Sequence, residues 1–98
     1  MSTWEELDNH IPYAKHLSGG RKTMAGAAQT VTIPSGTIYV DLVAEGGDGR
    51  FAVDTAATAT SSLIVAEAMV RKVYLVGNTS LSVYGETGTY IHYDFYGI

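Results

Sequence analysis

The C-terminal part of the chain carries a suggestive pair of ionisable side chains, His92 and Asp94. A two-residue spacing puts both on one face of a strand, where a histidine and a carboxylate can relay a proton or bind a metal ion. The spacing supplies no third ligand, and such pairs are common on exposed strands. We therefore expect neither catalysis nor a metal site here, and we expect His10 and His16 at a surface or interface.

Three carboxylates, Glu45, Asp48 and Asp54, surround a glycine-rich turn at residues 46–49. Oxygen ligands suit a hard cation such as Ca²⁺, but the turn lacks the D-x-D-x-D-G spacing of a calcium loop. It also lacks the Lys-Ser/Thr pair and the following helix of a phosphate loop. No serine lies in a Gly-x-Ser-x-Gly elbow. The sequence therefore predicts solvated turn carboxylates, no enzyme, no catalytic residue and no cofactor.

Tyrosine is the more informative residue type, because five tyrosines occupy the expected outward positions of their strands. They are Tyr39, Tyr74, Tyr84, Tyr90 and Tyr96. Tyrosines on a half-wet sheet face pack across strands. They also suit a contact surface, because tyrosine offers a large area at a small cost in side-chain entropy.

Alternation of apolar and polar residues between turn-forming Gly, Pro and Asn defines the elements that position these side chains. It predicts seven strands, at residues 29–33, 37–45, 50–54, 63–66, 71–76, 80–84 and 89–96. The short loop at residues 85–88 predicts a hairpin between the last two. The fold class is then all-β, a small antiparallel β-sandwich or barrel of about seven short strands. The expected core is Val40, Leu42, Phe51, Val53, Leu75, Val83, Ile91 and Phe95, with Tyr93 close by.

Residues 1–28 show no strand period and are expected to form an N-terminal arm, with residues 29–98 as the β domain. The arm is expected to start in a short helix, because Ser2 and Glu5, or Thr3 and Glu6, have capping-box spacing. Only one or two turns can follow before Pro12, which disfavours the helical conformation at Ile11. The alternative is a disordered tail, but the segment has too many large apolar side chains for a solvated tail, so we expect a partner to bury them. The predicted partner-binding residues are Trp4, Leu7, Ile11 and Tyr13, with Arg21 and Lys22 steering association.

Composition excludes several classes of protein. A net charge of −4 without a Lys/Arg run argues against nucleic acid. No apolar run reaches the ~18–20 residues of a membrane span, and the N-terminus is not a signal peptide, which predicts synthesis in a cytosol. Zero cysteines exclude disulfides and Cys-based zinc sites. Only 16% of residues are charged, against ~25% in ordinary domains, which indicates either a surface covered by neighbours or a neutral Thr-rich β surface.

Four stretches share a recurrent pattern of turns and strands, at residues 33–42, 49–54, 57–62 and 81–90. They read Ile-Pro-Ser-Gly-Thr-Ile-Tyr-Val-Asp-Leu, Gly-Arg-Phe-Ala-Val-Asp, Ala-Thr-Ala-Thr-Ser-Ser and Leu-Ser-Val-Tyr-Gly-Glu-Thr-Gly-Thr-Tyr. In this pattern the chain resembles small β-rich virion proteins of tailed bacteriophages, of the head decoration (cement) or head–tail accessory type. The likeness spans about residues 29 to 97 and leaves the arm uncovered.

This resemblance implies a non-enzymatic structural virion protein, made in the host cytoplasm. The preferred reading is a capsid decoration protein that binds the major capsid protein or other virion subunits on the capsid surface and bridges them, as a trimer. The alternatives are a head–tail connector, neck or tail component, and, from another class, a carbohydrate-binding β-sandwich module.

Overall fold

Alternating side chains build a two-layered structure in the computed structural model, which describes residues 14–60, 63–78 and 80–98. These residues form eight strands and no helix. The strands are β1 (Lys15–Thr23), β2 (Gln29–Val31), β3 (Thr37–Glu45), β4 (Gly49–Val53), β5 (Ile64–Val65), β6 (Arg71–Tyr74), β7 (Leu81–Tyr84) and β8 (Tyr90–Gly97). The predicted all-β class is confirmed, while the predicted N-terminal helix lies outside the described residues. Within those residues we find no helix of the length and apolarity that crossing a membrane requires.

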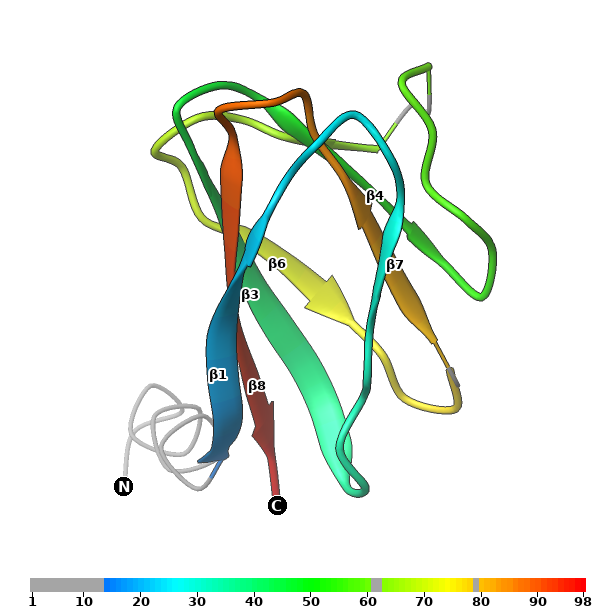
Figure 1. Ribbon diagram of the computed structural model, residues 1–98. Helices are drawn as coiled ribbons and strands as arrows, with labels where there is room; N and C mark the ends of the chain where they lie inside the picture. The colour runs from blue at the N-terminus through cyan, green and yellow to red at the C-terminus, as the bar shows by residue number, and fades with distance from the viewer. Residues whose placement is uncertain (1–13, 61–62, 79) are drawn as a thin grey trace.

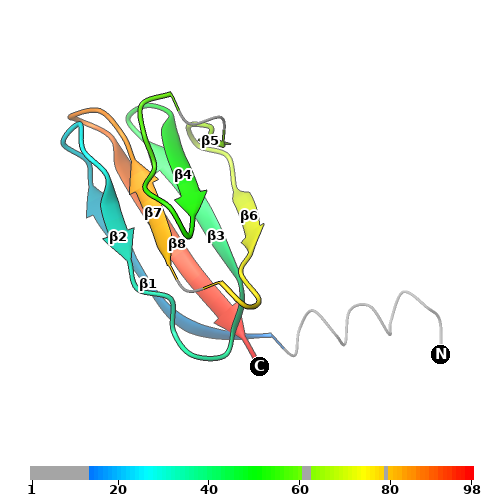
Figure 2. The ribbon, with the colours of Figure 1, turned by 90° about the vertical axis from the view of Figure 1, so that its right-hand side faces the viewer.

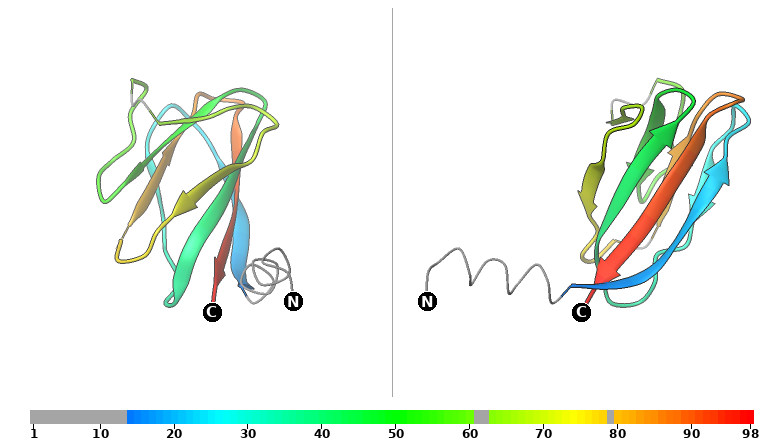
Figure 3. Two further views of the ribbon diagram at one scale, coloured as in Figure 1. Left: turned by 180° about the vertical axis from the view of Figure 1, so that it is seen from behind. Right: turned by 90° about the vertical axis from the view of Figure 1, so that its left-hand side faces the viewer.

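The strands pair into two four-stranded antiparallel sheets that face each other (Figure 1). Sheet A has the order β1-β8-β3-β6, and sheet B has the order β2-β7-β4-β5. Figure 3 (right) shows sheet A, with the long strands β8 and β3 at its centre. Two sheets with these interleaved orders form a jelly roll, a β-sandwich in which most connections cross from one sheet to the other. Of the two predicted architectures, sandwich or barrel, the structure has the sandwich, with eight strands in place of about seven.

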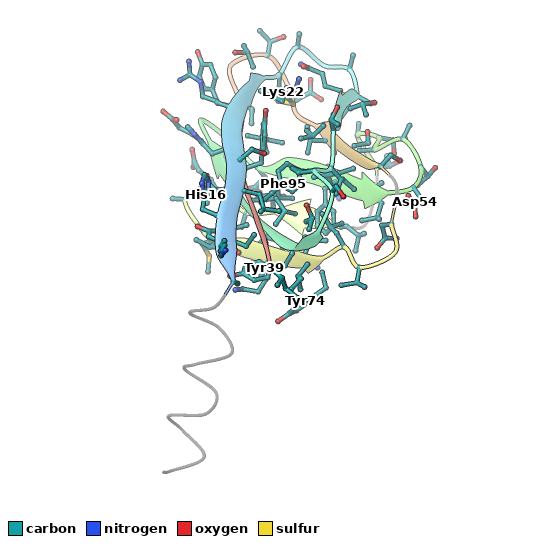
Figure 4. All side chains as sticks on the ribbon, turned by 90° about the horizontal axis from the view of Figure 1, so that it is seen from below. His16, Lys22, Tyr39, Asp54, Tyr74 and Phe95 are labelled. Carbon is teal, nitrogen blue, oxygen red and sulfur yellow. The ribbon has the colours of Figure 1, made fainter. Side chains whose placement is uncertain are left out.

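The inward side chains of both sheets meet in a single core. Of the eight expected core residues, seven are buried, and Val53 is half-buried but packs against the same cluster. Phe95, at the centre of β8, is completely buried, and Figure 4 shows it between the sheets. Tyr93 also packs against the cluster. The period-2 pattern predicted the core correctly, because a strand with one buried face can adopt only one register.

The predicted hairpin at the end of the chain is wrong. β7 pairs with β2 and β4 in sheet B, whereas β8 pairs with β1 and β3 in sheet A. The loop between them therefore carries the chain from one sheet to the other. Gly88 supports this turn with a φ of 96°. Two alternating strands joined by a short loop can pair side by side or face each other across a core, and alternation alone does not distinguish these arrangements.

The eighth strand, β1, lies in the segment expected to be an arm. It pairs with β8 from Lys15 opposite Gly97 to Thr23 opposite Tyr90, and Met24, directly after it, is only 1% exposed. The predicted boundary at residue 29 is thus wrong for residues 15–28. The strand escaped the pattern analysis because it lies at an edge of the sheet, with most of its side chains exposed. Backbone hydrogen bonds place such a strand, and these leave no apolar period in the sequence.

Truncation of Phe95 tests the core. Phe95→Ala should lower the free energy of unfolding by ~3–5 kcal/mol, because a fully buried aromatic side chain leaves both lost contacts and a cavity. Val76→Ala is the matched control, since Val76 is 72% exposed and should change stability by less than ~0.5 kcal/mol. Denaturant unfolding measures both variants. A loss below ~1 kcal/mol for Phe95→Ala would contradict the assignment of the inward face.

Substitution of two glycines with nearly equal φ tests the close approach of the loops that contain Gly46 and Gly88. Gly46 has a φ of 84° and Gly77 a φ of 83°. A Cβ added at Gly46 would overlap the carbonyl oxygen of Gly88, whereas one added at Gly77 meets nothing within 4 Å. Gly77→Ala should cost ~1–2 kcal/mol for the left-handed conformation alone. Gly46→Ala should cost a further ~1–3 kcal/mol from the overlap, and equal losses in thermal or denaturant unfolding would refute the close approach.

Candidate functional site

The outer face of sheet A carries a row of four aromatic side chains, one from each strand. His16 of β1 lies opposite Tyr96 of β8, Tyr96 lies opposite Tyr39 of β3, and Tyr39 lies opposite Tyr74 of β6. We call these four residues the aromatic row. The aromatic row crosses the full width of the sheet. Figure 4, which views the molecule from below, shows Tyr39 and Tyr74 close together.

Neighbouring rings in the aromatic row touch one another. The rings of Tyr39 and Tyr96 stack with centroids 5.0 Å apart and planes 19° apart. Tyr74 meets Tyr39 edge to face at 6.0 Å, and His16 meets Tyr96 edge to face at 5.4 Å. Aromatic pairs with these geometries each contribute about 0.5–1.5 kcal/mol beyond the area that they bury. Tyr74, at the open end of the row, remains 69% exposed.

A charged row runs beside the aromatic row. Asp94 lies opposite Asp41, and Asp41 lies opposite Lys72. Like charges opposite each other on neighbouring strands repel, and each carboxylate has a cationic or ionisable neighbour that offsets this repulsion. His16 Nε2 lies 2.9 Å from Asp94 Oδ1, and Lys72 Nζ lies 3.9 Å from Asp41 Oδ1.

Lys72 also joins the two rows. Its Nζ lies 3.9 Å from the centroid of the Tyr39 ring, which is a cation–π contact. Its distance to Asp41 is that of an ion pair but is too long for a hydrogen bond, and the buried Oδ1 of Asp41 has no hydrogen-bond partner among the described residues. We therefore attribute the position of Lys72 to the ring at least as much as to the carboxylate.

The far end of the same face carries a second histidine–carboxylate pair and a hollow. His92 Nε2 lies 2.7 Å from Glu45 Oε1, and Arg21 lies over the Tyr90 ring at 4.7 Å. The hollow has a volume of about 340 Å³, within the usual range for ligand pockets of about 300–1,000 Å³. Its lining consists of Val43, Ala44, Glu45, Gly46, Glu67, Ala68 and His92. The hollow lies before the start of β6, where Glu67 forms a β-bridge with Ala44 of β3.

His92 and Asp94 point outward on β8 as expected, but each binds a different partner. His92 pairs with Glu45, and Asp94 pairs with His16. In the described part of the chain, no three His, Asp or Glu side chains lie close enough together to share a metal ion. The arrangement therefore suits two separate surface pairs.

The turn carboxylates mainly organise the loops around them. Asp48 Oδ1 accepts a hydrogen bond from the Glu67 amide at 2.8 Å. Asp54, with a φ of 59°, accepts hydrogen bonds from the Asn78 side chain and from the Ser80 amide. Carboxylates that satisfy backbone amides in this way hold turns in place.

The predicted partner-binding residues fall into two groups. Trp4, Leu7, Ile11 and Tyr13 lie outside the described residues, so their contacts stay predictions. Arg21 and Lys22 lie in β1, opposite His92 and Ile91 of β8. Arg21 is thus part of the outer face of sheet A, where its guanidinium group covers the Tyr90 ring.

Four of the five tyrosines expected on outward positions lie on this face, and Tyr84 lies on sheet B. Sequence reasoning missed His16 and Lys72 as members of the surface. His16 lies in the unpredicted strand β1, so nothing indicated its neighbours. The alternation at residues 71–76 placed Lys72 outward with Tyr74, but only the strand order brings it to Tyr39 and Asp41.

Comparison of the chain with known protein families, with characterised proteins and with solved structures gives no match in any of the three. The proposed function therefore rests on the geometry of the chain and on the resemblance of residues 29 to 97.

The two tyrosines with raised pKa values give a test of the surface chemistry. The pKa of Tyr84 is raised above its ordinary 10.0, first because its hydroxyl donates to Glu86. The pKa of Tyr96 is raised first by desolvation and then by Asp94 and Asp41. An unfolded chain ionises both phenols at the ordinary value, so their contribution to stability is complete below pH 10 and is lost as the pH rises through the raised values.

Site-resolved NMR titration of the tyrosine ring carbons measures this effect. Glu86→Gln removes the anionic acceptor and should lower the pKa of Tyr84 while leaving that of Tyr96 unchanged. Asp94→Asn should lower the pKa of Tyr96 and leave that of Tyr84 unchanged. If neither substitution moves the titration of its tyrosine, the contacts on these two faces are wrong.

Proposed function

We propose that this chain is a non-enzymatic structural protein that binds other protein subunits through the outer face of sheet A. The observation that carries the proposal is the aromatic row, which spans all four strands and ends in the exposed Tyr74. Tyrosine and arginine side chains, here with Arg21 over the Tyr90 ring, are typical of protein contact surfaces. Their rings are already held by one another, so binding immobilises few side chains that were free.

The virion of a tailed phage is our preferred setting, as the resemblance of residues 29 to 97 implies. Jelly rolls recur among viral capsid domains, which agrees with this setting by analogy of fold. The chain then decorates the capsid surface, contacts the major capsid protein and bridges neighbouring subunits, preferably as a trimer. Residues 1–13 reach a neighbouring subunit or the capsid lattice, with Trp4 as an anchor.

Two other functions have specific support. A neck or tail position would use the same contact face, and copy number separates it from decoration: hundreds of copies per particle indicate decoration, and a dozen or fewer indicate the neck or tail. Jelly rolls also recur among lectins, and exposed Tyr74 beside Asp41 and Lys72 offers a ring and polar groups to a sugar. Binding on a glycan array, together with no binding to particles, would favour that function.

Binding to purified particles tests the proposal directly. Trp4→Ala and Tyr74→Ala should each weaken binding by ~2 kcal/mol if the residue is a hot spot, which is roughly a 30-fold rise in the dissociation constant. Thr87→Ala, at an exposed position in the turn between β7 and β8, is the matched control and should bind normally. Sedimentation with labelled protein measures the three variants.

A deletion completes the test and must stop before β1. Removing residues 1–13 leaves every strand in place and should preserve unfolding behaviour while abolishing particle binding. Removing residues 1–28 would take away β1 and uncover one edge of β8. Normal binding by the 1–13 deletion would show that the N-terminal segment is only a tail. Normal binding by Tyr74→Ala as well would contradict the proposal.

A further inference from the structure

Exposed apolar side chains gather on one side of the sandwich. Of the seven large apolar residues exposed in the described chain, six lie within residues 63–76, and the seventh is Ile98. We call these six the apolar side: Leu63, Ile64, Met69, Val70, Tyr74 and Val76. Figure 2 shows β5 and β6 together on this side, away from β1 and β2. Exposed apolar side chains that gather on one side of a protein indicate an interaction site.

The N-terminal segment of the same chain has the matching chemistry. Residues 1–13 contain four large apolar side chains beyond Met1 (Trp4, Leu7, Ile11 and Tyr13) and three carboxylates, with no Lys or Arg. β6, on the apolar side, carries two cations, Arg71 and Lys72. Of the carboxylates near it, Glu67 precedes the strand and Asp41 pairs with Lys72 at 3.9 Å. Segment and surface are thus both apolar, and the surface presents two cations to the three carboxylates of the segment.

The edge strand β1, on the opposite side of sheet A, is the other surface whose charge could attract residues 1–13. Lys15, Arg21 and Lys22 give β1 three cations and no acid, but no large apolar side chain on β1 is exposed. Burying a large apolar side chain stabilises a contact more than a surface ion pair does. Four apolar side chains therefore favour the apolar side.

The length of residues 1–13 indicates whether they bind the apolar side of their own molecule or that of a second copy. The segment joins the sandwich at β1, and β6 lies three strands away across sheet A, a distance of about 14 Å at the usual strand spacing. A chain extends at most ~3.6 Å per residue. Counted from Lys15, where β1 begins, Tyr13 is two residues away, so its backbone extends at most ~7 Å and covers only about half of this distance. A second copy is free of this limit and can receive all four apolar side chains.

We propose that residues 1–13 of one copy bind the apolar side of a second copy. The inference rests on the proposed role of the N-terminal segment and names its receptor. The contact is heterologous, because the donating segment and the receiving surface are different parts of the chain. Such contacts close into rings where the rotation allows, which is the geometry of a cyclic trimer.

Cysteine cross-linking tests the contact, since the natural chain has no cysteine. Full-length Leu7→Cys protein labelled with ¹⁵N is mixed with unlabelled Val76→Cys protein and oxidised, and mass spectrometry counts mixed disulfides. The matched control replaces Val76→Cys with Ser18→Cys, an exposed position on the opposite edge of sheet A. Because a bound segment has an effective concentration in the millimolar range, the mixed disulfide with residue 76 should form at least about tenfold faster at micromolar protein.

The outcomes separate the alternatives. Equal rates at residues 76 and 18 overturn the proposal, and a faster reaction at residue 18 assigns the segment to β1. A chain carrying both Leu7→Cys and Val76→Cys that closes only on itself assigns the contact to one molecule and also overturns it. Lys72→Glu should reduce the mixed disulfide several-fold, whereas Lys15→Glu should not.

These measurements use purified protein without particles. Cross-linking can therefore fail while particle binding persists, which would leave the proposed function standing and remove only the contact between copies. The converse result, normal cross-linking without particle binding, would leave the contact and remove the function.

Discussion

Strand connections that cross the core are the constraint on which this structure depends. Among the eight strands of the described chain, only β4 and β5 are consecutive and paired with each other; every other pair of consecutive strands lies in different sheets. Neither sheet can therefore complete its hydrogen bonds before both apolar faces meet around residues such as Phe95. Most contacts join distant parts of the sequence, a topology that folds slowly and cooperatively. Packing both inner faces in this way leaves the outer face of sheet A free for the aromatic row.

Two surfaces follow from this arrangement, and they have different chemistry. The outer face of sheet A combines touching rings with ion pairs, from His16 at one edge to Tyr74 at the other. The apolar side lies at the edges β5 and β6, where short strands leave Met69 and Val76 exposed. A protein that bridges subunits needs two contact regions. In our proposal the apolar side receives a neighbouring copy, and the outer face of sheet A, which shares Tyr74 with it, binds the capsid.

The alternation of apolar and polar residues predicted correctly the features that depend on burial of one face of a strand. The inward positions of β3, β4 and β8 were correct because Val40, Phe51 and Phe95 each belong to a strand with one apolar face to hide. Alternation could not predict β1, whose edge position depends on backbone pairing with β8, nor the partner of β7, which depends on strand order. The outward tyrosines were predicted for the same reason as the core. Their union into one row with His16 was not, because it needs the register of four strands that are distant in sequence.

Amide hydrogen exchange tests most directly whether copies of this chain bind one another through the apolar side. The full chain and a chain lacking residues 1–13 are compared at the same concentration, high enough for association. Our account predicts slower exchange over residues 69–76 in the full chain only, with equal exchange along β1 in both. Equal exchange over residues 69–76 in the two chains, or protection confined to β1, would contradict it.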